Sequence, residues 1–219
     1  MTIVKTETSS RRMDAGRLVM VPLCTLMLTA DAIILTQSVG PGFAGVLRWI
    51  SNALVGAFYV LIIWAYLRRG PAKATTTSVV ARTAAVTGTL TPFVFPMLPN
   101  GTVSMSRELV ADVFLVTGTV WSLWSLRTLG KNLSIIAQAR EVVEHGPYRW
   151  IRHPLYTGEI VSSLGLAIAV GTVPAAAVWC TLVALQVYRA SQEEQILITT
   201  LPPYTAYRAR TAALLPGVF

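Results

Sequence analysis

The sequence is poor in charge for its length: 13% of its 219 residues are Asp, Glu, Lys or Arg, against 53% hydrophobic residues. Soluble domains carry about 25% charged residues, so this composition excludes a soluble globular enzyme. The same hydrophobicity excludes an intrinsically disordered chain. Cysteine is also scarce, with Cys24 and Cys180 each inside an apolar segment. This excludes a disulfide-built domain, and we expect both cysteines to pack as small apolar side chains and no metal ion to be bound.

Several common functional motifs are missing as well. The sequence has no GxGxxG, P-loop, GxSxG or HExxH pattern, which removes the simplest arguments for a nucleotide-binding or hydrolytic site. The net charge of +8 could indicate nucleic-acid binding. The basic residues form no single patch, however, so we expect no nucleic-acid partner.

Apolar residues lie in six long segments, several of which reach the roughly 20 residues that a helix needs to cross a bilayer. These segments are residues 17–39, 46–67, 79–98, 109–126, 155–170 and 173–188. Only Gly171 and Thr172 separate the last two, which predicts a tight helical hairpin with Pro174 in the first turn of its second helix. The sequence therefore predicts an all-α integral membrane protein with six transmembrane helices, or five if the last hairpin is re-entrant.

The distribution of Lys and Arg predicts the orientation of these helices. Sixteen of the 18 basic residues fall in the N-terminal segment, the second-to-third connection, the fourth-to-fifth connection and the tail, and the exceptions are Arg48 and Arg107. The positive-inside rule then places both termini in the cytoplasm. We expect the membrane to be a bacterial-type inner (plasma) membrane or an endomembrane.

The fourth-to-fifth connection concentrates residues that can do chemistry. It contains both histidines of the chain, and its end places Pro154 in the first turn of the fifth helix, where free N–H groups can attract a carboxylate or phosphate. His153 can donate a hydrogen bond, and the rings of Tyr148 and Tyr156 can stack on a base or form an interfacial aromatic belt. Glu159 lies one turn further into the membrane and is either a site residue or a structural partner.

A second polar cluster follows the sixth segment. We expect the helix to continue through Arg189, Glu193 and Glu194, and the first two share a face because they are four residues apart. Residues 201–207 (LPPYTAY) then break the helix and return the chain towards the membrane. Because the hairpin brings the start of the fifth helix and the end of the sixth to one side, the two clusters should form a cytoplasmic pocket that the tail closes.

At these residues the sequence resembles the isoprenylcysteine carboxyl methyltransferase (ICMT) family, and it is similar to the phospholipid methyltransferases. The matching pieces are residues 129–134 (LGKNLS), 146–148 (GPY), 152–156 (RHPLY), the Glu193–Glu194 pair with Leu197, and Tyr204 and Tyr207 before residues 215–216 (LP). The resemblance covers residues 127–219 and divides the chain into an N-terminal tail (1–16), four transmembrane helices (17–126) and a methyltransferase core (127–219).

The resemblance implies a membrane methyltransferase that uses S-adenosylmethionine and acts on a lipophilic small molecule or prenylated acceptor entering from the bilayer. Arg189 would be the catalytic residue that holds the acceptor carboxylate, with Glu159 beside it. The residues implied for the cofactor are Gln138, the strand-like Arg140, Glu141, Val142 and Val143, then Tyr148, His153, Pro154, Leu155, Tyr156 and Glu193. The sequence departs from the family pattern in two places. Leu201-Pro202-Pro203 stands where the family has Phe-Gly, which affects the geometry of the tail, and Glu144-His145 stands where the family has small hydroxyl residues, which affects the identity of the acceptor.

The residues suit O-methylation of an isoprenylcysteine-like carboxylate, because a carboxylate is already ionised at neutral pH and needs no general base. A phospholipid amine or a thiol acceptor stays open, and there Glu159 or His153 could take the proton. Sterol reductases, which use NADPH, share a run similar to residues 152–159, and a non-catalytic six-span protein is the third alternative. The sequence says nothing about the oligomeric state.

Overall fold

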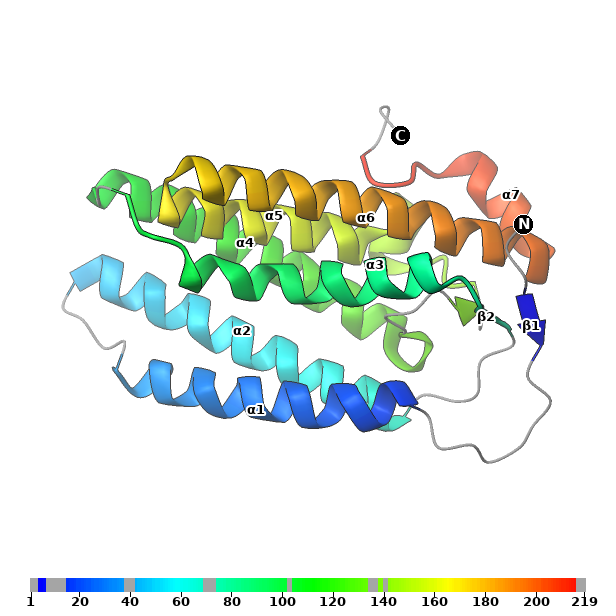
Figure 1. Cartoon of the computed structure of the whole chain (residues 1–219), viewed down its shortest axis with the longest axis horizontal. Coiled ribbons are helices and arrows are strands. Elements are labelled where there is room, and N and C mark those ends of the chain that lie inside the picture. The colour runs from blue at the N-terminus through cyan, green and yellow to red at the C-terminus, as the bar shows by residue number, and fades with distance from the viewer. Residues whose placement is uncertain are drawn as a thin grey trace.

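A computed structural model describes residues 4–6, 15–37, 42–68, 74–101, 104–133, 138–139 and 142–215 of the chain. Within this part, six helical segments run side by side along the long axis of the molecule (Figure 1). They are α1 (Ala15–Gln37), α2 (Gly42–Arg68), α3 (Val79–Leu90) with the 3₁₀ helix η1 (Thr91–Met97), α4 (Met105–Leu129), α5 (Pro154–Val170) and α6 (Val173–Thr200). Each predicted apolar segment is therefore helical.

Four of these helices, α1, α2, α4 and α6, are long and apolar enough to cross a membrane. Helix α5 has 17 residues, which span about 26 Å at roughly 1.5 Å per residue, slightly less than the ~30 Å hydrocarbon core. The third segment is α-helical for only 12 residues, because Pro92 and Pro96 lie in the following 3₁₀ helix and cannot donate the backbone hydrogen bonds of an α-helix. The chain is thus a membrane protein, and a total of six spans stays a prediction.

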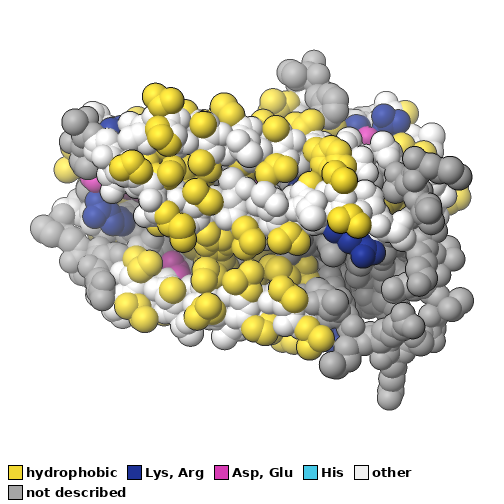
Figure 2. Space-filling model, in the orientation of Figure 1, with side chains coloured by type: hydrophobic (Ala, Val, Ile, Leu, Met, Phe, Trp, Pro, Cys, Tyr) yellow, Lys and Arg dark blue, Asp and Glu magenta, His cyan; other side chains and the backbone are white. Residues whose placement is uncertain are grey.

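The surface agrees with a lipid environment. Large apolar side chains are exposed along the helices, for example Leu26 in α1 and Val60 in α2, which are 61% and 50% exposed. Figure 2 shows hydrophobic side chains spread over the length of the helices, with Lys and Arg side chains towards the ends. A water-soluble bundle would bury such residues, whereas lipid solvates them.

Helices α4 and α5 form an intimate antiparallel pair because glycines lie at their contact. A Cβ added to Gly118 would overlap the backbone of Ser162, and one added to Gly158 would overlap the hydroxyl of Ser122. Small residues let two helix backbones approach closely inside a membrane. Helix α6 follows α5 through Gly171 in the left-handed conformation (φ +64°) and Thr172, which confirms the predicted tight hairpin.

One end of the bundle carries the N-terminus of α1, the C-termini of α2, α4 and α6, and the tail; we call it the basic end. A small antiparallel sheet joins three distant segments here, β1 (Val4–Thr6), β2 (Ala74–Thr76) and β3 (Gln138–Ala139), in the order β1-β2-β3. The all-α prediction is correct for the bundle and missed this sheet. Of the predicted strand-like stretch 140–143, Val142 and Val143 are irregular, and Arg140 and Glu141 lie outside the described residues.

The tail folds back over the start of α5. After α7 (Pro203–Arg210), the chain runs beside residues 151–153, where the backbone N–H of Arg152 donates to the carbonyl of Ala212 at 2.8 Å and that of His153 to Ala213 at 3.0 Å. The Thr157 hydroxyl donates to the carbonyl of Leu214 at 3.0 Å. The predicted return of the tail towards the fifth helix is therefore present.

Candidate active site

The buried carboxylate of Glu194 connects three segments at the basic end. Its Oε1 lies 2.6 Å from Nε of Arg152 and 3.3 Å from Nε2 of His153, and its Oε2 lies 3.2 Å from Nε of Arg208. These partners come from the approach to α5 and from α7, while Glu194 belongs to α6. A buried charge is stable only when it is paired, so this network fixes the tail against the α5–α6 hairpin.

The adjacent Glu193 has a different environment. Its Oε2 accepts a hydrogen bond from the Tyr156 hydroxyl at 3.1 Å and lies 3.7 Å from Nδ1 of His153. The rings of His153 and Tyr156 are nearly parallel, at an interplanar angle of 2° with centroids 5.5 Å apart. Both residues lie at the start of α5, where Pro154 is the first helical residue and His153 is the N-cap.

A small polar pocket opens beside these groups and encloses about 60 Å³. We call it the polar pocket. Its lining consists of Leu129, Asn132, Val142, Val143, Tyr148, Arg152, His153, Glu193, Leu197, Tyr204 and Tyr207. The two sequence clusters, one before α5 and one after the membrane part of α6, therefore meet as predicted.

The three tyrosines of this pocket carry neutral hydroxyls that are able to donate hydrogen bonds. Burial raises the pKa values of Tyr148, Tyr204 and Tyr207 above the ordinary value near 10, and the carboxylates of Glu193 and Glu194 add to the shift. Tyr207 donates to the Tyr148 carbonyl at 2.5 Å. The buried hydroxyl of Tyr204, in contrast, has no hydrogen-bond partner among the described residues.

Arg189 lies in a second buried cluster, on α6 next to α5. Its Nη1 donates to Oε1 of Gln186 at 2.9 Å, and Nε2 of Gln186 donates to Oε2 of Glu159. Arg189 is 6% exposed and Gln186 is fully buried. The α3 backbone packs against the arginine at Gly88, where an added Cβ would lie 3.2 Å from Cδ of Arg189.

Tyr156 joins the two clusters. The guanidinium carbon of Arg189 lies 4.8 Å from the centre of its ring, while its hydroxyl is bonded to Glu193. A cation at this distance from an aromatic centroid is attracted by the ring. Tyr156 therefore lies between the polar pocket and the Arg189 cluster.

The structure brings together part of the predicted set of site residues. Five predicted cofactor residues line the polar pocket: Val142, Val143, Tyr148, His153 and Glu193. Pro154 and Leu155 are buried outside the lining, and Leu155 packs in an apolar cluster with Tyr66 and Leu126. Gln138 is a strand residue of β3, paired with Thr75, and Arg140 and Glu141 lie outside the described residues.

Sequence reasoning missed the role of Gln186, which links Arg189 to Glu159. A polar side chain inside an apolar segment, one helical turn before a buried arginine, was the available signal. The sequence also gave no reason to place Leu129 or Asn132 at the pocket, because their contribution depends on where the chain turns after α4 at Gly130 (φ +53°).

The family model of the isoprenylcysteine carboxyl methyltransferase (ICMT) family matches residues 110–199, from the first turns of α4 to the end of α6. No curated protein matches the chain. The matched segment contains Tyr156, Glu159, Arg189 and Glu193, whereas α7 with Tyr204 and Tyr207 lies beyond it. Over residues 110–199 the chain is therefore similar to the ICMT family.

Proposed function

We propose that this protein is an S-adenosylmethionine-dependent methyltransferase that methylates the carboxylate of a lipophilic, isoprenylcysteine-like acceptor. The family match supports a membrane methyltransferase in general. The observation that carries the finer proposal is the position of Tyr156, which contacts both Glu193 of the polar pocket and the buried guanidinium of Arg189. A donor site and an anion-binding site can meet at this ring.

The chemistry of the polar pocket fits the cofactor. The Tyr204 hydroxyl has no partner among the described residues and can donate to a ligand, and the Glu193 carboxylate can accept from ribose hydroxyls or pair with an ammonium group. Val142, Val143 and Leu197 offer apolar surface to a base. The volume of about 60 Å³ is below the roughly 300–1,000 Å³ of ligand pockets, so binding requires the tail and the connector before α5 to move apart.

The bound cofactor would supply a methyl group on a positively charged sulfur, and the chain's own residues would position the acceptor. Arg189 would pair with the acceptor carboxylate, and Gln186 would hold the guanidinium in place through its bond to Glu159. An ionised carboxylate needs no base. Alignment of the two reactants can then supply several kcal/mol of the barrier reduction, and burial of Arg189 excludes water from the pair.

The basic end would face the cytoplasm, since sixteen of the 18 basic residues belong to segments on that side. The acceptor would reach Arg189 from the bilayer. An amine or thiol acceptor is the main alternative, and it would use Glu159 or His153 to take a proton. An NADPH-dependent reductase and a non-catalytic membrane protein are the remaining alternatives, and the family match favours neither.

The proposal is tested by calorimetric titration of the detergent-purified protein with S-adenosylhomocysteine and, separately, with NADPH. We expect micromolar binding of S-adenosylhomocysteine and no binding of NADPH. Binding of NADPH alone would contradict the methyltransferase proposal. If neither ligand binds, the titration is repeated in lipid nanodiscs, and a second negative result would leave the non-catalytic alternative.

A further inference from the structure

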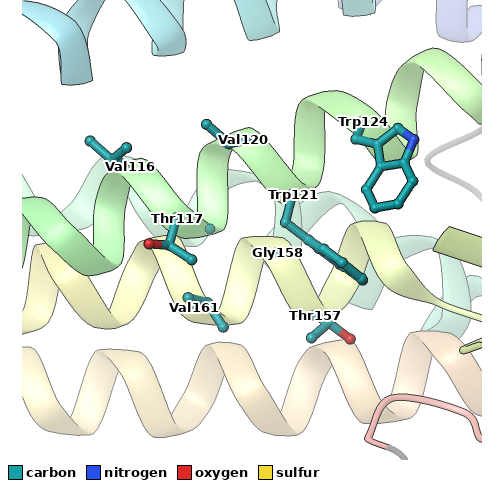
Figure 3. A pocket seen from close by; sticks show the side chains of 9 residues that line it. Val116, Thr117, Val120, Trp121, Trp124, Thr157, Gly158 and Val161 are labelled. Atoms are coloured by element: carbon teal, nitrogen blue, oxygen red, sulfur yellow. The ribbon is translucent and has the colours of Figure 1, made fainter.

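A second concavity lies away from these two clusters, on the surface between α4 and α5. This apolar groove has a volume of about 490 Å³ and is lined by Val116, Thr117, Gly118, Val120, Trp121, Trp124, Thr157, Gly158 and Val161. Figure 3 shows Thr117, Trp121 and Val161 between the two helices, with the indole rings towards the basic end. None of the residues implied for cofactor or acceptor lines it.

The groove follows from the glycine contact of α4 and α5. The two backbones touch at Gly118 and Gly158, which have no side chains to keep them apart. For the same reason these two residues leave a depression on the outer side of the helix pair. Val120 and Trp124 are 49% and 43% exposed beside it. In a membrane this opening faces lipid chains, because α4 is one of the spanning helices.

A row of aromatic rings leads from the groove to a cation. Trp121 contacts Trp124 edge-on at 5.5 Å between centroids, and Trp124 contacts Trp150 at 5.7 Å. The guanidinium carbon of Arg149 lies 4.4 Å from the centre of the Trp150 ring. Arg127 follows Trp124 by three residues, on the same face of α4.

Among the described residues, neither Arg127 nor Arg149 forms a salt bridge. Both are exposed at the end of α4 and just before α5. Arg127 and Arg149 thus place two positive charges, unpaired with any described acidic side chain, at the end of an apolar groove. This arrangement matches a molecule that has a hydrocarbon chain and a single anionic head group. Basic sites between helices at the membrane surface are known to bind anionic lipid head groups.

We propose that the apolar groove is a binding site for an anionic phospholipid, with one acyl chain between α4 and α5 and the phosphate at Arg127 and Arg149. The site is separate from Arg189, which faces α3 and Tyr156. It is nevertheless connected to the tail, because the groove residue Thr157 donates a hydrogen bond to the carbonyl of Leu214. A bound lipid therefore stabilises the segment that covers the polar pocket.

The experiment titrates the full chain in detergent with palmitoyl-oleoyl phosphatidylglycerol or with phosphatidylcholine of the same chains, and native mass spectrometry reports the bound lipid. We expect the wild-type protein to prefer phosphatidylglycerol. Each arginine near a membrane surface contributes about a fivefold gain in affinity for anionic lipid. The double variant Arg127→Gln/Arg149→Gln should therefore bind phosphatidylglycerol about 25-fold more weakly and phosphatidylcholine with unchanged affinity.

Two matched controls separate the site from general surface charge. Arg68 also lies over a tryptophan, at 5.4 Å from the Trp64 ring, but Trp64 does not line the apolar groove, so Arg68→Gln should keep the preference. Val161→Trp fills the groove and should remove the preference, whereas Val113→Trp, on an exposed position of the same helix pair, should keep it. Equal affinity of the wild type for both lipids would overturn the proposal, and so would a lipid preference that survives in Val161→Trp. If the wild type forms dimers that Val161→Trp dissociates, the groove binds a second copy of the chain and the proposal is also overturned.

Discussion

The two clusters at the start of α5 differ in how their charges are balanced. The cluster around Glu194 joins two arginines and a histidine to one carboxylate and ties the tail to the hairpin. The cluster around Arg189 has a single cation, and a neutral amide separates it from Glu159. The first arrangement ties the tail to the hairpin, while the second holds a buried guanidinium beside a neutral amide and the Tyr156 ring. Under the proposed function, the first cluster would serve stability and the second the acceptor.

The largest expected effect is on the Glu194 cluster. Glu194→Gln removes the negative charge that pairs with Arg152 and Arg208, and we expect the free energy of unfolding to fall by about 3–5 kcal/mol, as for other broken buried ion pairs. Chemical unfolding in detergent measures this change, and limited proteolysis should show faster cleavage after residue 200.

The matched control is Glu144→Gln. Glu144 pairs with Arg210, and both side chains are largely in solvent, at 39% and 60% exposure. A solvent-exposed pair contributes less than about 1 kcal/mol, so this variant should unfold like the wild type. If the two variants unfold alike, the Glu194 network does not hold the tail.

Arg189→Ala tests the second cluster. We expect turnover with a carboxylate acceptor to fall by about 100- to 1,000-fold, the range for loss of one group that stabilises a reacting anion. Binding of S-adenosylhomocysteine should stay within about threefold of the wild type, because Arg189 does not line the polar pocket. Calorimetry and a methyl-transfer assay measure the two quantities.

Glu193→Ala provides the opposite pattern. Glu193 lines the pocket and bonds to Tyr156, so its removal should weaken cofactor binding first. Loss of cofactor binding in the Arg189 variant, or intact binding in the Glu193 variant, would mean that the division between the two clusters is wrong.

Gln186→Leu should have an intermediate effect. Without the amide, Arg189 loses the partner that fixes its Nη1, and we expect kcat/KM for the acceptor to fall about tenfold, the effect of one hydrogen bond to a charged group. Gln195→Leu, at an exposed position of the same helix, is the control and should change neither kcat nor KM. A purely structural role of Gln186 would instead lower cofactor affinity and stability together.

The smallest effects separate the two tail tyrosines. Tyr207→Phe removes the donor to the Tyr148 carbonyl and should cost about 1 kcal/mol of stability without ligand. Tyr204→Phe removes a buried hydroxyl that has no partner among the described residues, so stability without ligand should not fall. Cofactor affinity should nevertheless drop severalfold in the Tyr204 variant. Unfolding curves with and without S-adenosylhomocysteine compare the two.

The helical bundle could be predicted because a long apolar segment in a membrane has few alternatives to the α-helix, which satisfies its own backbone hydrogen bonds. The boundary of α6 was also predictable, since nothing between Arg189 and Thr200 interrupts the helix before Pro202. The sheet of β1, β2 and β3 was not, because strands of two or three residues from distant segments carry no periodic signal. The place of Leu155 was missed for a related reason: a turn motif shows which residues are present, but not which side of the turn faces the core.

The sequence by itself determined that this is a helical membrane protein and that its polar, chemistry-capable residues concentrate before and after the last hairpin, because hydrophobic length and motif order are properties of the chain. The tertiary structure alone decided which glutamate holds the tail, that Gln186 joins Arg189 to Glu159, and that an apolar groove lies between α4 and α5. These features depend on which faces of the helices meet. That choice is made by glycine contacts and buried charge pairs between residues far apart in the sequence.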